Sequence, residues 1–226
     1  MSEDAGFWEV LETLVPLGLV GAFSWLPVTG VVVLLLAPEG RAKVPAFLAG
    51  RVVGLAAVTV ACVAGARALP SVPHLDGPVV ASTEVVTGVA LVLVGLFSWH
   101  GRHHVHHRTT PAWLGRLGRA SPTAVFTTSV LIDLQPKGLL LGVAAGAVVR
   151  GGSMPGAEAV IAVVLYLALA ASSVFLPVVA TAVAPARTSG WLRAARDWLT
   201  AHGSVVTAVV AALVGLLLVV DAVARF

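Results

Sequence analysis

TAVFTTSVLIDLQPKGLLLGVAAGAVV, residues 123–149, is a long apolar run with a polar segment near its middle. The polar segment is DLQPKG, residues 133–138, and it contains an acid, an amide, a proline and a lysine. One charge at the centre of a membrane-spanning helix costs about 2.5–3.5 kcal/mol on translocon scales. We therefore expect this segment to face the interior of a helix bundle rather than lipid, and the rest of the sequence supports that interpretation.

The composition is that of a membrane protein. Of 226 residues, 58% are hydrophobic and only 11% are charged, whereas soluble domains carry about 25% charged residues. A helix needs roughly 20 apolar residues to cross a bilayer. Six such runs occur, at about 10–37, 45–69, 79–99, 123–149, 158–183 and 203–224. The sequence predicts an all-α membrane protein with six transmembrane helices, built as a single integral membrane domain over residues 1–226.

The basic residues are distributed unevenly between the two sides of these spans. Nine lie in the connections after spans one, three and five, and three lie on the other side. The nine are Arg41, Lys43, Arg102, Arg108, Arg116, Arg119, Arg187, Arg193 and Arg196, and the three are Arg67, Arg150 and Arg225. The positive-inside rule makes the nine-residue side cytoplasmic. We expect both termini outside, in a multi-pass protein of the cell inner (plasma) membrane, and no nucleic-acid partner despite the net charge of +3.

An internal repeat indicates how the spans are organised. Residues 85–96, VVTGVALVLVGL, match residues 205–216, VVTAVVAALVGL, at eight of twelve positions. Spans one and four also share an internal proline, Pro27 and Pro136. Because three is an odd number of spans, the second half would enter the membrane from the opposite side, as in many transporters. The sequence thus predicts two inverted three-helix repeats, about 8–100 and 123–226, separated by a cytoplasmic His/Arg loop at about 100–122.

The interrupted spans contain the candidate substrate site. In inverted-repeat transporters the broken helices of the two halves meet at the binding site, which here indicates Ser24 and Pro27 in span one and DLQPKG in span four. Asp133 and Lys137 are spaced i, i+4 and are expected to pair on one helix face, with Gln135 beside them. Pro136 removes an N–H and displaces the carbonyl four residues earlier. An internal salt bridge that only fixes helix packing is the alternative interpretation.

Arg51 and the connections have two interpretations each. Arg51 lies two turns into span two, where it either extends to the inner interface or lines an entrance and attracts an anionic group. The segments 111–119 and 191–202 have apolar and basic faces, which is typical of helices lying on a membrane surface; a gating or partner-binding role is the alternative interpretation. Cys62 is the single cysteine, so dithiol redox chemistry within the chain is excluded.

The sequence HGRHHVHHR, residues 100–108, concentrates five histidines in the expected cytoplasmic loop. Clustered imidazoles bind zinc, nickel or cobalt. No cysteine or nearby carboxylate completes a closed site, and the alternative is a polar loop that titrates near neutral pH. The candidate metal ligands are His100, His103, His104, His106 and His107.

Three segments resemble one known family in order and spacing. They are LLLAPEGRAKVPAFLAGRVVGLA (34–56), LQPKGLLL (134–141) and RDWLTAHGSVVTAVVAALVGLLLV (196–219). They are similar to the GAP or Sap (sulfolipid-1-addressing protein) family, an actinobacterial branch of the LysE transporter superfamily. The resemblance implies six spans in two repeats and a role in moving cell-envelope glycolipids. The chain departs from the family's Asn-Pro-Lys-Asn pattern at QPKG (135–138) and from its span-one Ser-Pro pattern at SWLP (24–27).

The leading functional hypothesis is export or translocation of a cell-envelope (glyco)lipid or similar amphiphile through a site between spans one and four. There Lys137 and Arg51 would attract an anionic headgroup, and Asp133 would hold Lys137 or exchange a proton. The alternatives are a divalent-metal exporter that uses the His loop and a non-transporting scaffold for envelope-lipid assembly. Neither an enzyme nor a cofactor is expected. Expected partners are the lipid or amphiphilic substrate and envelope-lipid biosynthesis or export proteins, and a homo-oligomer is left open.

Overall fold

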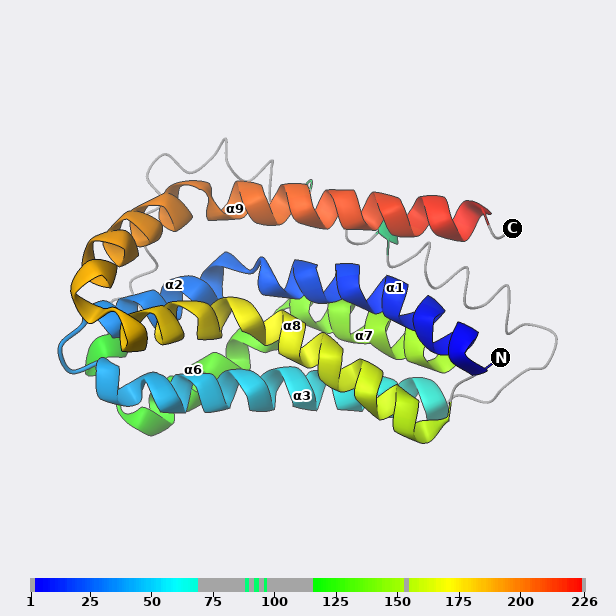
Figure 1. Cartoon of the computed structure of the whole chain (residues 1–226), viewed down its shortest axis with the longest axis horizontal. Coiled ribbons are helices and arrows are strands. Elements are labelled where there is room, and N and C mark those ends of the chain that lie inside the picture. The colour runs from blue at the N-terminus through cyan, green and yellow to red at the C-terminus, as the bar shows by residue number, and fades with distance from the viewer. Residues whose placement is uncertain are drawn as a thin grey trace.

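The protein is built from α-helices that run mainly along one direction (Figure 1). The computed structural model describes residues 3–68, 116–152 and 155–224, with short pieces at 88–89, 92–93 and 96. No strand occurs in these residues, which confirms the all-helical prediction. The helices are α1 (Glu3–Ala22), α2 (Trp25–Leu36), α3 (Val44–Ala68), α6 (Pro122–Asp133), α7 (Pro136–Gly151), α8 (Gly156–Val183) and α9 (Pro185–Ala224), with 3-10 turns η1 (Arg41–Lys43) and η2 (Leu117–Arg119).

Two of the expected spans are broken in their middles, as the sequence predicts. The chain bends by 47° between α1 and α2 and by 61° between α6 and α7. A proline lies just beyond each break, Pro27 in α2 and Pro136 in α7. Each displaces the carbonyl four residues earlier, which belongs to Phe23 in the first break and to Ile132 in the second.

Proline alone does not break a helix in this protein. Pro16 lies inside α1 and Pro177 inside α8, and both helices continue through these positions. The breaks differ because an extended residue precedes the second helix of each pair. Ser24 has φ −100° and ψ 111°, and Gln135 has φ −64° and ψ 155°. Each break is therefore a helix end followed by a new helix start rather than a kink.

The number of membrane crossings is only partly determined. The segment Arg41–Ala68 and helix α8 are each long and apolar enough to span a bilayer, and the total rises to four if each bent pair is one span. The expected third span, 79–99, lies largely outside the described residues. The sixth lies within α9, whose 40 residues correspond to about 60 Å. Six spans and the inverted repeat remain predictions.

Helix α9 combines two segments that the sequence suggests are separate. Its first part contains the amphipathic segment around residues 191–202, and its second part contains the expected sixth span. Figure 1 shows that α9 changes direction between these parts, and that α1 begins and α9 ends at the same end of the bundle. The placement of the two termini relative to a membrane stays a prediction.

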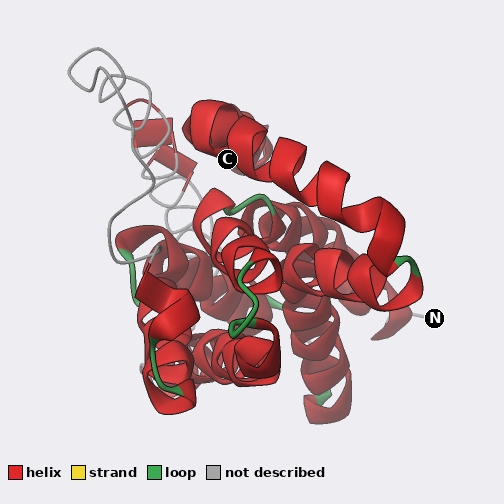
Figure 2. Ribbon diagram, turned by 90° about the vertical axis from the view of Figure 1, so that its left-hand side faces the viewer, coloured by secondary structure: helices red, strands yellow, loops and turns green. Residues whose placement is uncertain are grey.

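Helix α3 lies against α6 and α7, α1 packs against α8, and α2 packs against α9. Figure 2 looks toward the left-hand end of Figure 1 and shows the helix that ends at C lying along one edge of the bundle. Without a hydrophobic driving force in lipid, helices associate through close packing at small residues. Helix α3 shows this: Gly50 approaches the Phe126 carbonyl of α6, and a Cβ there would lie 2.9 Å from the Cβ of Ser129.

Glycines on the partner helices make similar contacts. A Cβ on Gly142 of α7 would lie 2.8 Å from a methyl carbon of Val58, and one on Gly146 would lie 2.8 Å from the Cys62 carbonyl, both in α3. Gly215 of α9 likewise packs on the backbone of Gly88, within the first copy of the repeated sequence. Close glycine contacts thus fix α3 against both halves of the broken α6–α7 pair.

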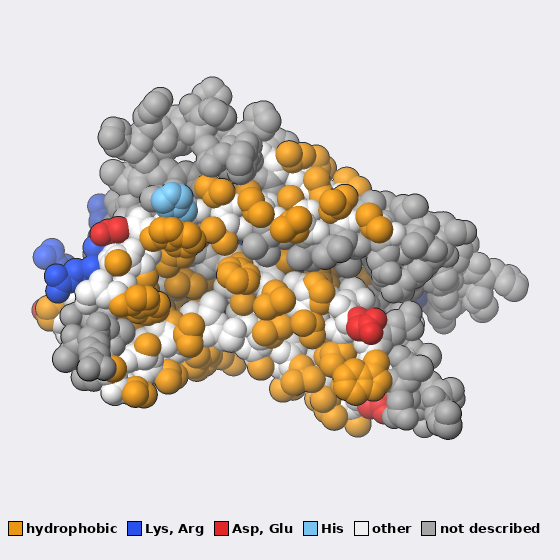
Figure 3. Space-filling view, turned by 45° about the horizontal axis from the view of Figure 1, so that its top comes forward, with side chains coloured by type: hydrophobic (Ala, Val, Ile, Leu, Met, Phe, Trp, Pro, Cys, Tyr) orange, Lys and Arg blue, Asp and Glu red, His pale blue; other side chains and the backbone are white. Residues whose placement is uncertain are grey.

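The outer surface is strongly apolar. Helix α8 exposes a row of large hydrophobic side chains, including Val160, Val164, Leu176 and Val179, and Leu176 is 66% exposed. Figure 3 shows hydrophobic side chains along the middle of one face, with lysine and arginine side chains gathered at its left-hand end. A contiguous apolar surface of this kind marks contact with a partner or a membrane. Together with the long apolar helices, it indicates a membrane protein.

Gly50→Ala tests the close contact between α3 and α6. We expect a loss of about 1–3 kcal/mol in stability, because the added methyl group overpacks a backbone-to-backbone contact. Gly65→Ala is the matched control on the same helix, because nothing lies within 4 Å of that position. Thermal unfolding in detergent measures both. Equal unfolding midpoints for the two variants would contradict the packing described here.

Candidate functional site

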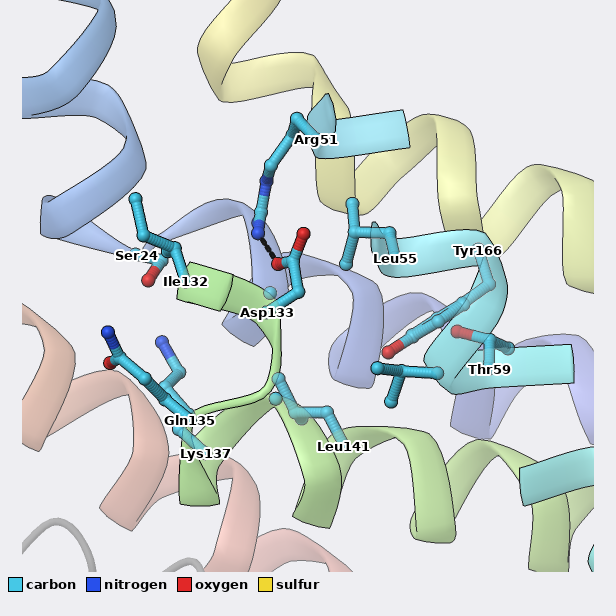
Figure 4. A pocket seen from close by; sticks show the side chains of 13 residues that line it. Ser24, Arg51, Leu55, Thr59, Ile132, Asp133, Gln135, Lys137, Leu141 and Tyr166 are labelled. Atoms are coloured by element: carbon cyan, nitrogen blue, oxygen red, sulfur yellow. Dashed lines mark ion pairs between the residues drawn. The ribbon is translucent and has the colours of Figure 1, made fainter. Parts of the chain in front are cut away.

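The two helix breaks meet at one small polar cavity. Its volume is about 30 Å³, enough for roughly two water molecules. Figure 4 shows Gln135 and Lys137 on one side of it, Tyr166 and Thr59 on the other, and Arg51 with Asp133 between them. The lining residues are Gly21, Ser24, Arg51, Leu55, Val58, Thr59, Ile132, Asp133, Gln135, Lys137, Gly138, Leu141 and Tyr166.

An ion pair between Arg51 of α3 and Asp133 of α6 lies at this cavity. Each residue is only 3% exposed. A buried charge in a membrane protein needs such a partner, since water is not available to solvate it. The expectation that Arg51 extends to the membrane interface is therefore wrong, because its guanidinium turns inward to Asp133.

The predicted pairing of Asp133 with Lys137 is also wrong. Side chains at i and i+4 face each other only along a continuous helix. Here α6 ends at Asp133, and α7 begins at Pro136 in a direction 61° away. The break carries Lys137 off the face that Asp133 occupies, and Arg51 takes the place of the predicted partner.

Glycine spacing on α3 allows this ion pair to form. Gly50 and Gly54 flank Arg51 on the helix surface that contacts α6. A Cβ on Gly54 would lie 2.7 Å from Oδ2 of Asp133 and 3.1 Å from the Cα of Val130. The two glycines thus bring the helices close enough for Arg51 to reach the end of α6.

Lys137 connects the second break to the first. Its Nζ donates a hydrogen bond of 3.4 Å to the carbonyl oxygen of Phe23. Pro27 displaces that carbonyl from the α-helical pattern because it lacks an N–H and its ring clashes with the carbonyl four residues earlier. Each half of the chain therefore contributes one partner, the Phe23 carbonyl from the first break and the Lys137 ammonium group from the second.

The residues that begin the second helix of each pair also line the cavity. Ser24 is the N-cap of α2 and Gln135 is the N-cap of α7, and neither side chain caps its own helix. Both are therefore available to face a bound group. Pro27 and Pro136, also predicted site residues, flank the cavity without lining it, and they act through the backbone.

Two polar atoms of the ion pair lack hydrogen-bond partners among the residues that the structure describes. They are Nε of Arg51 and Oδ2 of Asp133, and both are buried. An unsatisfied buried polar atom costs about 1–3 kcal/mol. The cavity beside them has room for water or for a polar group that would satisfy them.

Tyr166 of α8 and Thr59 of α3 line the cavity and were missed by the sequence analysis. Both are buried, with 3% and 1% of their surface exposed. Tyr166 is the single tyrosine of the chain and lies in the middle of an apolar span. That position was a usable signal, because a phenol hydroxyl inside a span needs a polar surrounding.

The histidine cluster lies outside the described residues, so the metal-site prediction is untested. Within the described ranges, no group of three or more His, Cys, Asp or Glu side chains could hold a metal ion. Cys62 is partly buried in α3, and a Cβ on Gly142 of α7 would lie 3.2 Å from its Sγ. A packing role for Cys62 agrees with this contact.

A double-mutant cycle tests the ion pair. Arg51→Met or Asp133→Leu alone should cost about 3–5 kcal/mol, because each leaves one buried charge without a partner. The double variant should recover much of that loss. Glu39→Leu and Arg41→Met, at exposed positions in the connection before α3, form the control cycle and should show little coupling. Denaturant unfolding measures all variants, and simple additivity at Arg51 and Asp133 would contradict direct pairing.

Comparison with known proteins gives one match. A family model described as Sap, sulfolipid-1-addressing protein, matches residues 14–224. Searches of curated proteins and of solved structures found no match. The matched region includes both helix breaks, Arg51 and Tyr166. It covers nearly the whole chain, and the protein therefore belongs to the Sap (sulfolipid-1-addressing protein) family.

Proposed function

We propose that the protein is a membrane transport protein that exports or translocates a cell-envelope (glyco)lipid or similar amphiphile. The observation that carries this proposal is the meeting of two broken helices at a polar cavity inside an otherwise apolar bundle. Irregular backbone at membrane depth is tolerated where it is buried in protein or lines a cavity. In secondary transporters, such helices from two halves form the substrate site.

The family name supports a lipid as the substrate class. It describes a sulfolipid-addressing protein, and addressing a lipid to a membrane or surface requires its polar headgroup to pass an apolar barrier. A protein-lined polar site lowers that barrier, because it replaces part of the water that the headgroup loses. The buried Arg51 and Asp133 and the partly buried Lys137, which all line the cavity, would serve this purpose.

The size of the cavity indicates how transport would proceed. A volume of about 30 Å³ is far too small for a sugar headgroup, since it holds roughly two water molecules. Translocation therefore requires helix movement, and the breaks at residues 23–24 and 134–135 are the natural hinges. Rocking of α2 and α7 about these points would open the site by turns to either side, as in alternating access.

The site residues have separate roles in this proposal. Lys137 and Arg51 hold the polar part of the substrate, and Ser24 and Gln135 supply hydrogen bonds from the two helix starts. Asp133 keeps Arg51 in place between cycles. The resting ion pair would also link α3 to the hinge, so that substrate entry and helix movement are coupled.

Lys137→Ala and Asp133→Ala test the proposal in reconstituted vesicles. A fluorescent glycolipid is placed in both leaflets, and its movement is measured by chemical quenching of the outer leaflet. Each substitution should slow translocation at least about tenfold, the effect of losing about 1.4 kcal/mol of stabilisation in the rate-limiting step.

Lys43→Ala is the matched control, because it removes the other lysine of the chain. Lys43 lies just before α3, where it donates a hydrogen bond of 2.7 Å to the Gly118 carbonyl. It should leave the rate near that of the wild type. Wild-type rates in both site variants, at equal amounts of reconstituted protein, would contradict the site assignment. No lipid movement by the wild-type protein would contradict translocation and favour a scaffold role.

A further inference from the structure

The two helix breaks divide the bundle into two parts, each with its own apolar cluster. Figure 1 shows α1 and α7 in the right-hand part of the bundle and α2 and α6 in the left-hand part. The α1–α7 cluster also includes α8, and Leu14 and Val148 are among its buried members. The α2–α6 cluster also includes α3 and α8, and Val31 and Val125 are among its buried members.

The polar cavity lies between these two clusters and borders both. Leu141 and Tyr166 line the cavity and belong to the α1–α7 cluster, whereas Ile132 lines it and belongs to the α2–α6 cluster. Along the bundle, the cavity is therefore flanked by an apolar cluster on each side. Apolar constrictions of this kind can close a path to water and to polar groups.

The α2–α6 cluster contains two leucines that come from the connections between the expected spans. Leu117 belongs to η2 and Leu192 to the first part of α9, and they are only 3% and 1% exposed. The sequence predicts both segments as helices on the membrane surface. Trp191 and Trp198, beside Leu192, are indeed 51% and 52% exposed. One leucine of each segment nevertheless inserts into the bundle.

These two leucines pack at the far end of a helix that begins at a break. Helix α2 starts after the break at residues 23–24, and it packs against both η2 and α9. At its other end, a Cβ on Gly118 of η2 would lie 3.0 Å from the Cβ of Ala37, the C-cap of α2. Movement of α2 about the break therefore requires η2 and α9 to release it.

We infer that the α2–α6 cluster is a gate and that Leu117 and Leu192 are its plug. This inference rests on the proposed function and adds the element that controls access to the site. The plug closes the cavity toward the end that holds η1 and η2, the predicted cytoplasmic side, and it withdraws before α2 can swing. Burial of two leucine side chains stabilises the closed state, because their withdrawal returns apolar surface to water.

The other end of the cavity is closed in a different way. Every buried member of the α1–α7 cluster within the described ranges belongs to α1, α7 or α8. That end is closed by helix packing alone, and movement of α7 would open it. The two gates can thus open separately, as alternating access requires, and only the α2–α6 gate depends on a connection.

A reversible disulfide across the plug tests the inference. Ala37→Cys and Gly118→Cys are combined in a Cys62→Ala background, so that these two are the only thiols of the chain. A small shift of η2 brings their Cβ atoms to the roughly 3.5–4.5 Å of a disulfide. The oxidised protein should form this disulfide and lose translocation of the fluorescent glycolipid, and a reducing agent should restore both the thiols and the rate.

The control disulfide joins α1 to α8, neither of which moves in this account. Gly18→Cys and Leu169→Cys suit it, because a Cβ on Gly18 would lie 3.3 Å from the Cβ of Leu169. It is placed in the same Cys62→Ala background. Oxidation of this pair should leave the translocation rate unchanged.

A second measurement follows the gate without any transport. Thr59→Cys, again without Cys62, places one thiol on the cavity wall at a position that is 1% exposed. Its reaction with a water-soluble maleimide reports how often the cavity opens. Leu192→Ala should raise that rate at least about tenfold, because the closed state loses a buried leucine. Leu176→Ala, at a 66% exposed position of α8, should not change it.

The inference is overturned if the Ala37→Cys and Gly118→Cys pair gives no disulfide, if the oxidised protein translocates as fast as the reduced one, or if Leu192→Ala labels no faster than Leu176→Ala. The cross-linking arm removes no buried side chain, so it decides the question even if Leu192→Ala does not fold. A wild type that moves no lipid refutes the proposed function instead, and the labelling rates still show whether Leu192 closes the cavity.

Discussion

The ion pair between Arg51 and Asp133 is the interaction on which the arrangement of this protein depends. Neither charge can remain inside an apolar bundle without the other, because burial of an unpaired charge costs several kcal/mol. The pair therefore requires α3 to lie directly against α6, and Gly50 and Gly54 make that approach sterically feasible. It also holds the end of α6 in place, so the direction of α7 beyond the break is defined relative to α3.

The second constraint is that backbone hydrogen bonding is interrupted at the two helix breaks. Of the prolines at four places in the described helices α1, α2, α7 and α8, Pro16 and Pro177 lie inside continuous helices, whereas Pro27 and Pro136 lie in the first turn after a break. At the first break, Lys137 from the other half donates to the Phe23 carbonyl, and at the second, Arg51 pairs with the side chain of Asp133. The breaks are thus mutually supporting, and a small polar cavity forms where they meet. The transport site that we propose lies where the two breaks meet.

The positions of the two helix breaks that form the candidate site could be predicted from sequence, but the ion-pair partner of Asp133 could not. Proline positions and the polar residues at 24–27 and 133–138 indicated both breaks, because local sequence determines where a helix can continue. The partner of Asp133 depends on tertiary contact between α3 and α6, which lie far apart in sequence. Assuming a continuous helix led to Lys137 as that partner, and the 61° bend removes this possibility. The Gly50 and Gly54 spacing around Arg51 was the available signal for close packing, and the isolated Tyr166 was a signal for the cavity.

The most direct test of the central claim, that the two breaks meet at one cavity, is chemical cross-linking between them. Ser24→Cys and Gln135→Cys are combined in a Cys62→Ala background, so that these are the only thiols of the chain. Because both positions line a cavity of about 30 Å³, a short thiol-reactive cross-linker should join them in membranes. Pairing Ser24→Cys with Thr128→Cys, which does not line the cavity, should give no product. Failure of the first pair to cross-link, although each cysteine alone reacts with the reagent, would contradict the account.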